Sequence, residues 1–78
     1  MERFKRTQTN EIVVGEIRAA MARKGLKPLA VAAAVGMNRS SIYRRLNGDT
    51  PFDLDEILAI ADVLEVPASS FFPLVRAA

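Results

Sequence analysis

The sequence predicts an all-α domain of five short helices, and three observations support this fold class. Apolar residues recur every three or four positions, which is the period of an amphipathic helix. Glycines and prolines separate these periodic segments, where they end one helix or open the next. No segment alternates apolar and polar residues as a half-buried strand does. The 78 residues correspond to one domain, which we place at residues 9–75.

The first helix is predicted over residues 11–24, after a flexible basic arm formed by residues 1–8. Thr9 or Asn10 is expected to cap it, because a side-chain oxygen there can accept a hydrogen bond from an unpaired backbone N–H. Gly15, inside the helix, marks either a close packing point or a weak spot. The predicted buried stripe, whose members lie one helical turn apart, consists of Val13, Ile17, Ala20 and Met21.

A short aliphatic helix is predicted next, over residues 28–35. Pro28 opens it, because the missing N–H does no harm in a first turn. Ala32 is small enough to lie where two helices touch, and Gly36, four positions later, can adopt the positive φ of a tight turn. This spacing predicts a helix-turn-helix over residues 28–48. Its inward-facing apolar residues are expected to be Val31, Val35, Met37 and Ile42.

The third helix is predicted over residues 39–47, with Asn38 as its cap and Gly48 at its end. Ile42 and Leu46 are expected to face inward, because they lie four residues apart. None of the outward positions is acidic. These positions are Asn38, Arg39, Ser40, Tyr43, Arg44 and Asn47, with Ser41 and Arg45 at the edges.

The outward side chains of this helix suit contacts with the base edges of double-stranded DNA. Arginine can donate to N7 and O6 of guanine, asparagine can pair with adenine, and serine can serve either base. Tyr43 can stack, contact a thymine methyl group or bond a phosphate through its hydroxyl. The alternative is a solvated surface helix, although such helices usually mix charges of both signs.

A fourth helix is predicted over residues 54–64, where Asp53 and Glu56 form a capping box. A Val-Pro pair ends it, and a short fifth helix is predicted over residues 68–73. The predicted stripe of the fourth helix is Leu54, Ile57, Leu58, Ala61 and Leu64. The residues that follow exceed what one small core requires, and they either close the core or form a patch for self-association. They are Phe71, Phe72, Leu74 and Val75.

Charge is distributed unevenly along the chain. Residues 1–48 carry a net charge of +7 and residues 49–78 a net charge of −5. A domain polarised in this way can present one face to a polyanion and keep the other face away from it. Accidental clustering on a solvated surface is the alternative.

Several classes of protein are disfavoured by composition. The chain contains no Cys and no His, so we expect no disulfide, no zinc site and no cofactor. The usual groups for acid–base or nucleophilic catalysis are missing, and we therefore do not expect an enzyme. No apolar stretch is long enough to span a bilayer, and the charged first residues are unlike a signal peptide. We expect a cytoplasmic protein without membrane or small-molecule partners.

A family resemblance rests on three runs of residues: Gly25-Leu26-Lys27, Val35-Gly36-Met37-Asn38-Arg39-Ser40-Ser41-Ile42 and Ile57-Leu58-Ala59-Ile60-Ala61. With these runs the chain resembles the lambda-repressor-like, Cro-type (XRE) DNA-binding domain over about residues 11–73. The segment from Arg44 to Phe52 is similar to small regulators of actinobacterial phages and their hosts. The resemblance implies a five-helix bundle that binds an operator as a homodimer, with the third helix in the major groove.

The resemblance also implies roles for individual residues. Arg39, Ser40, Tyr43 and Arg44 would face bases. The expected phosphate contacts come from the flanks of the motif: Lys27, Asn38, Ser41, Arg45, Asn47 and Gly48. Together these expectations describe a sequence-specific transcriptional regulator acting in a bacterial cell or a phage-infected host.

Two positions depart from the family pattern. Pro28 stands where many members have a glutamine that contacts the DNA backbone, so that contact is lost. The second inward residue of the third helix is usually three positions after Ile42, which here is Arg45, with Leu46 next to it. Arg45 is therefore either a phosphate clamp or a cover for the core, with its aliphatic stem buried and its charge in water.

Two further questions stay open at this level. The basic residues Arg3, Lys5 and Arg6 either reach into a minor groove or belong to an ordinary disordered terminus. The same fold also serves antitoxin-type or adaptor-type protein-interaction modules, and excision-type factors that bend DNA. An interaction module would need residues 71–78 and tolerate the loss of Arg39 and Arg44.

Overall fold

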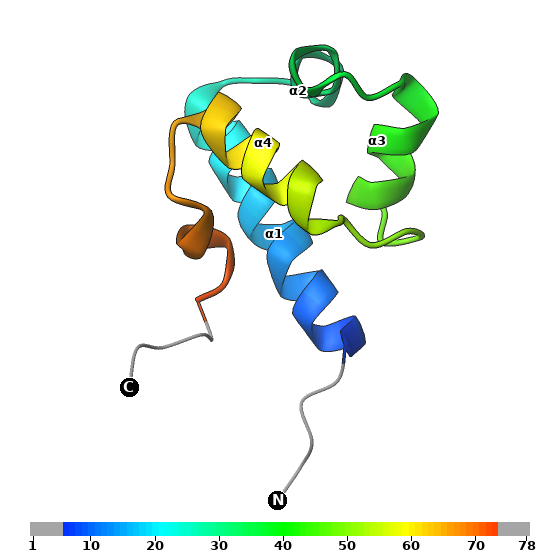
Figure 1. The fold of residues 1–78 in the computed structure, drawn as a ribbon, viewed down its shortest axis with the longest axis vertical. Helices are drawn as coiled ribbons and strands as arrows, with labels where there is room; N and C mark the ends of the chain where they lie inside the picture. The colour runs from blue at the N-terminus through cyan, green and yellow to red at the C-terminus, as the bar shows by residue number, and fades with distance from the viewer. Residues whose placement is uncertain (1–5, 74–78) are drawn as a thin grey trace, which may run out of the picture.

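A computed structural model describes the backbone of residues 6–73 and the side chains of residues 9–73 (Figure 1). These residues form four α-helices and one 3₁₀ turn, and none of them lies in a strand. The elements are α1 (Arg6–Lys24), α2 (Pro28–Val35), α3 (Arg39–Leu46), α4 (Leu54–Leu64) and η1 (Ala68–Phe71). The all-α class is confirmed.

The predicted fifth helix is a 3₁₀ turn, so the five-helix count is not confirmed. The element lies between Pro67, which precedes it, and Pro73, which follows Phe72. A residue before proline is disfavoured in the α region, and Phe72 accordingly adopts φ −126° and ψ 63°. The two prolines thus leave room for one tight turn only.

Helix α1 begins at Arg6, well before the predicted start at residue 11. Thr9 and Asn10 therefore lie inside the helix and not at its cap. No glycine or proline precedes Gly15, and a polar residue costs only a few tenths of a kcal/mol in a helix interior. The arm predicted over residues 1–8 is thus helical from residue 6, and residues 1–5 lie outside the described part of the chain.

One core joins all five elements. Five large side chains are less than 2% exposed, and each comes from a different element: Ile17, Val31, Ile42, Ile60 and Phe71. Burying an aliphatic or aromatic side chain of this size contributes about 1.5–3 kcal/mol. The short helices α2 and α3 are therefore held mainly by packing, since an isolated helix of 8 residues is unstable in water.

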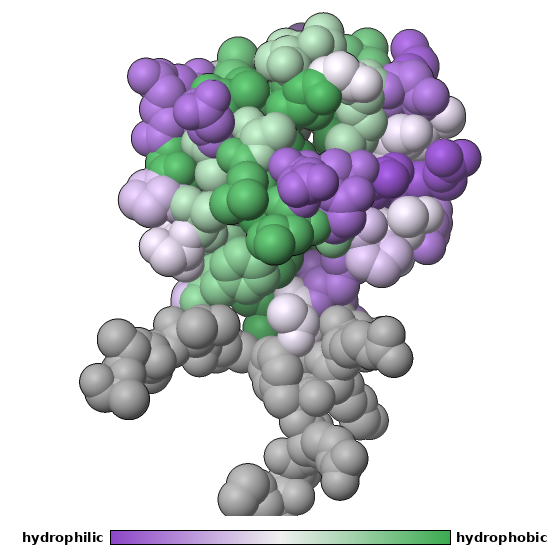
Figure 2. Space-filling model, in the orientation of Figure 1, coloured by the Kyte–Doolittle hydropathy of each residue, from purple (hydrophilic) through white to green (hydrophobic). Residues whose placement is uncertain are grey.

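The predicted stripe of α1 is confirmed, but the stripe of α4 is partly wrong. Val13, Ile17, Ala20 and Met21 are buried, as are Ile57, Ala61 and Leu64. Leu54 and Leu58, however, are 64% and 50% exposed, while Ile60 is 0% exposed. Helix α4 packs against α1, α2 and η1, and these contacts turn its Ile60 edge inward. Figure 2 shows apolar surface along the middle of this face, where α4 lies, and hydrophilic surface over α3.

An exposed ion pair joins the ends of α1 and α4. The Nζ atom of Lys24 donates a hydrogen bond to Oε1 of Glu65, the residue that follows α4 with a left-handed φ of 59°. The hydrogen bond and the positive charge of Lys24 lower the pKa of the Glu65 carboxyl group. This pair lies at the C-terminal ends of both helices.

Candidate nucleic-acid interface

The turn between α2 and α3 has the geometry predicted from the sequence. Gly36 adopts φ 76° and ψ 27°, and the next N–H, of Met37, donates to the carbonyl of Ala32 over 2.8 Å. Ala32 is 2% exposed and belongs to the buried core. A Cβ atom at Gly36 would meet nothing within 4 Å, and the glycine is therefore required by its positive φ and not by lack of space.

Asn38 caps α3 as predicted. Its Oδ1 accepts a hydrogen bond of 2.8 Å from the backbone N–H of Ser41 and one of 3.1 Å from the hydroxyl of Ser40. The backbone of Asn38 is extended, with φ −82° and ψ 168°. This cap satisfies an orphan N–H and sets the direction in which α3 leaves the turn.

Helix α3 has one buried face and one exposed face. Ile42 and Leu46 are buried, at 0% and 2% exposure, which confirms the predicted inward pair. The side chains expected to face bases are all exposed: Arg39, Ser40, Tyr43 and Arg44. The guanidinium carbon of Arg39 lies 5.8 Å from the centre of the Tyr43 ring, so a cation–π contact orients these two side chains together.

The exposed cations of this face have no acidic partner within the described residues. Ion pairs among residues 9–73 are Lys24–Glu65 and Arg45–Glu56, and neither involves Arg39 or Arg44. Lys27, the N-cap residue of α2, is also exposed and takes part in neither of these ion pairs. These charges are therefore available to an anionic ligand.

Arg45 lies at the edge of α3 and turns towards α4. Its Nε donates to Oε1 of Glu56 over 2.8 Å, and its Nη1 donates to the carbonyl of Ser41 over 3.2 Å. The two charged side chains are only 17% and 18% exposed. Arg45 thus belongs to the contact between α3 and α4. The sequence did not reveal this pair, because its formation depends on how the two helices pack.

Arg18 is a second contact that sequence reasoning missed. Its Nε and Nη2 donate to the carbonyl of Leu46, over 3.2 Å and 2.9 Å, and so hold the last residue of α3 against α1. A lone arginine on the polar side of an amphipathic helix has no sequence signature for such a role. The interaction spans 28 positions in the chain and follows from tertiary packing alone.

Helix α3 ends at Leu46, one residue before the predicted end, and the chain then turns sharply. Asn47 is the C-cap, and Gly48 adopts a φ of 85°. The N–H of Asp49 donates to the carbonyl of Arg44 over 2.9 Å, which closes the turn. Asn47 and Gly48 are exposed beside the end of α3, where a phosphate contact was expected.

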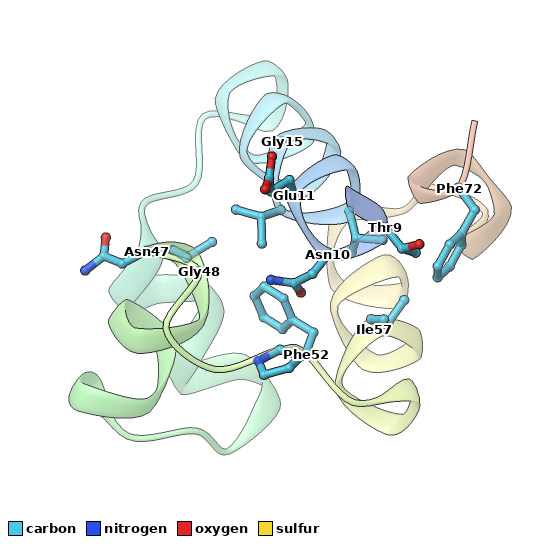
Figure 3. A pocket seen from close by; sticks show the side chains of 13 residues that line it. Thr9, Asn10, Glu11, Gly15, Asn47, Gly48, Phe52, Ile57 and Phe72 are labelled. Carbon is cyan, nitrogen blue, oxygen red and sulfur yellow. The ribbon is translucent and has the colours of Figure 1, made fainter. Parts of the chain in front are cut away.

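A groove of about 1010 Å³ lies at this end of α3 (Figure 3). Its lining comes from the first half of α1, Leu46 of α3, the connection between α3 and α4, Ile57 of α4, and Phe72. Phe52 is 7% exposed and joins the core here, so apolar packing determines where the connection leaves α3. Glu11 is the one titratable residue in the lining.

The exposed side of α3 thus brings together Arg39, Ser40, Tyr43 and Arg44, whereas Arg45 turns towards α4. Arg3 and Lys5 lie outside the described residues, and Arg6 is the first residue of α1. The described residues hold no group of three or more His, Cys, Asp or Glu that would suit a metal ion. None of their helices meets the length and hydropathy needed to cross a membrane.

The chain matches a family model described as a helix-turn-helix domain over residues 13–70. Comparison with curated proteins and with solved structures finds no match. The matched segment covers most of the chain and contains α2, the turn at Gly36 and α3. The chain therefore belongs to this helix-turn-helix family of DNA-binding domains.

Proposed function

We propose that this protein is a sequence-specific transcriptional regulator of the Cro or repressor type, which reads the major groove of double-stranded DNA with α3. One observation carries the proposal: the exposed face of α3 has two arginines and no acidic residue, while its opposite face is buried. Arg39 and Arg44 can each donate two hydrogen bonds to guanine. Ser40 and Tyr43 lie on the same face and complete the proposed base-reading set.

The residues around α3 support contacts with phosphates. Lys27 lies before the first turn of α2, and Asn38 and Ser41 lie at the start of α3. Asn47 and Gly48 are exposed at its other end. Contacts on both sides of a reading helix position it on the duplex, while the base contacts provide the specificity.

We propose further that two copies bind together on a two-fold operator. Regulators of this type read half-sites about one helical turn, or about 34 Å, apart. Each copy would place its α3 in one half-site. The symmetry of the bound sites therefore tests this part of the proposal.

The first experiment selects bound duplexes from random-sequence DNA and then titrates the protein on the selected duplex and on an unrelated one. Arg39→Ala and Arg44→Ala should each weaken binding to the selected duplex by about 1–3 kcal/mol and relax the base preference at one position. Lys27→Ala should weaken binding to both duplexes alike and reduce the salt dependence by about one phosphate contact.

Lys24→Ala provides the matched control, because it removes one positive charge from an ion pair that lies away from α3. It should leave the ratio of the two affinities unchanged. If Arg39→Ala and Arg44→Ala lower both affinities equally, the proposed base-reading role is incorrect. If no duplex is enriched from the random pool, sequence-specific regulation itself is incorrect.

A second candidate function is a protein-interaction module, favoured by the exposure of Leu54 and Leu58 on α4. Exposed large apolar side chains close together on one helix are common at protein contacts. Under this alternative, Leu58→Ser would abolish partner binding, and Arg39→Ala would leave it intact. A DNA-bending factor would instead be identified by the changed mobility of a bound fragment that carries the site at its centre.

A further inference from the structure

We propose that Arg45 is a positioning residue, whose pair with Glu56 sets the rotation of α3 about its own axis and so decides which side chains reach the bases. This inference rests on the proposed reading of DNA by α3. Under this proposal the side chain of Arg45 contacts other parts of the protein and does not contact a phosphate.

The guanidinium group of Arg45 is already occupied within the protein. Nε donates to Glu56 and Nη1 to the carbonyl of Ser41, over 2.8 Å and 3.2 Å. A phosphate that drew this group away would leave the carboxylate of Glu56 partly buried, without its partner, and close to a second negative charge. Both effects oppose a move of Arg45 to the DNA.

Glu56 is itself held in place by the start of α4. The same Oε1 atom accepts a hydrogen bond of 2.9 Å from the backbone N–H of Asp53, and Oδ1 of Asp53 accepts one of 2.8 Å from the N–H of Glu56. This reciprocal pair is the predicted capping box. The acceptor that Arg45 contacts is thus fixed to the α4 backbone, so the pair joins the edge of α3 to a rigid point.

The packing of α3 leaves a role for such a contact at the side of the helix, since Arg18 holds only its last carbonyl. The helix has 8 residues, and its buried side chains, Ile42 and Leu46, form a single row. A single row of buried side chains resists rotation about the helix axis less than a broad apolar face does. Arg45 lies at the edge of the helix, away from this row, where a contact opposes rotation of the helix most effectively.

The required precision makes this restraint important for base reading. An atom about 6 Å from the helix axis moves about 1 Å when the helix rotates by about 10°. A bidentate contact to guanine requires two hydrogen bonds of about 2.7–3.2 Å at the same time. A small rotation of α3 therefore weakens base contacts, whereas contacts with the phosphate backbone tolerate it.

The test compares Arg45→Met, Arg45→Lys and Glu56→Gln with the unchanged protein on the selected duplex and on an unrelated duplex. Arg45→Met should weaken binding to the selected duplex about tenfold and to the unrelated duplex less than about twofold, with an unchanged salt slope. Glu56→Gln should lower specificity in the same direction but by less, because it keeps an acceptor for Arg45 and removes only the charge of the pair. Arg45→Lys keeps a donor and a charge and should recover much of the specificity.

Glu56→Gln is informative because the amide oxygen of glutamine can still accept the hydrogen bond from the N–H of Asp53, which preserves the capping box, while the charge that attracts Arg45 is removed. The double variant with Arg45→Met should lose no more specificity than Arg45→Met alone, because both changes act on the same pair. Lys24→Met is the matched control, because it removes the other ion pair of the described residues and should leave the affinity ratio unchanged.

A second measurement needs no DNA. Backbone N–H residual dipolar couplings of α3 report its orientation in the folded protein, and they should change in Arg45→Met and Glu56→Gln but not in Lys24→Met. Equal losses on both duplexes, with a reduced salt slope, would identify Arg45 as a phosphate contact and overturn the proposal. Unchanged couplings in both variants would overturn it as well.

The two proposals can fail separately. If the unchanged protein shows no preference for any selected duplex, the proposed function fails, and the dipolar couplings still decide whether Arg45 positions α3. If the preference exists but survives in both folded variants, the proposed function stands and the positioning role of Arg45 is incorrect.

Discussion

Arg18 of α1 donates two hydrogen bonds to the backbone carbonyl of Leu46, the last residue of α3. The last carbonyls of an α-helix have no partner within the helix, and a cation at that end also interacts favourably with the helix dipole. One side chain thus satisfies an orphan acceptor and attaches the proposed reading helix to the longest helix of the fold. Loss of the Arg18 side chain is therefore expected to lower the stability of the fold and to release the end of α3 from α1.

Arg18→Met should lower the free energy of unfolding by about 1 kcal/mol, because it leaves the Leu46 carbonyl without this donor. Urea denaturation followed by circular dichroism measures the change. Arg23→Met, an exposed arginine on the same helix, is the control and should change the free energy by less than about 0.5 kcal/mol. Equal effects of the two substitutions would show that the contact with Leu46 contributes nothing.

Glycine-to-alanine substitutions at Gly36 and Gly15 should have opposite effects. At Gly36, alanine would retain a φ of 76°, which costs an L-residue about 1–2 kcal/mol, so stability should fall. At Gly15, within α1, a Cβ meets nothing within 4 Å and φ is not positive, so alanine should add up to about 1 kcal/mol. Thermal denaturation of both variants provides the comparison. Destabilisation by Gly15→Ala would point to a close packing point instead of a weak spot.

The orientation of α4 is tested by a pair of truncations on the same helix. Ile60→Ala should cost about 2–5 kcal/mol, because it removes a side chain that is 0% exposed. Leu58→Ala should cost less than about 1 kcal/mol, because half of that side chain is already in water. Chemical denaturation of both variants gives the two values. A larger loss for Leu58→Ala would favour the stripe that the sequence predicted.

The Lys24–Glu65 pair predicts a pH dependence of stability. The pKa of Glu65 is lower in the folded protein than in the unfolded chain, so the pair stabilises the fold above the unfolded pKa. This contribution is lost as the pH falls through the folded pKa. The melting temperature of Glu65→Gln should therefore lie slightly below that of the unchanged protein at neutral pH, with the difference vanishing in acid. Lys24→Met should behave in the same way, and a difference that is constant with pH would contradict this explanation.

Local chemistry explains what was predictable. The cap at Asn38, the capping box of Asp53 and Glu56, and the left-handed Gly36 all act within about four residues. For that reason the bounds of α2 and α4 matched the predictions, and α3 was shorter by one residue. The outward residues of α3 followed from helical periodicity, because Ile42 and Leu46 lie four residues apart and face inward together.

Local chemistry was less informative where no strong signal stood at a boundary. The first turns of α1 contain polar residues that tolerate a helix but do not demand one, and the predicted start was therefore too late. In the segment after α4 the predicted helix was too long. Two prolines limit that segment to a 3₁₀ turn.

The sequence by itself determined the helical class, the helix caps and the position of the turn between α2 and α3, since these depend on neighbouring residues. Only the tertiary structure decided that α4 buries Ile60 and exposes Leu54 and Leu58, because a period of 3.6 residues admits both stripes. The pairing of Arg18 with Leu46 and of Arg45 with Glu56 was decided there too. These contacts join residues far apart in the chain, and their formation depends on the packing of whole helices.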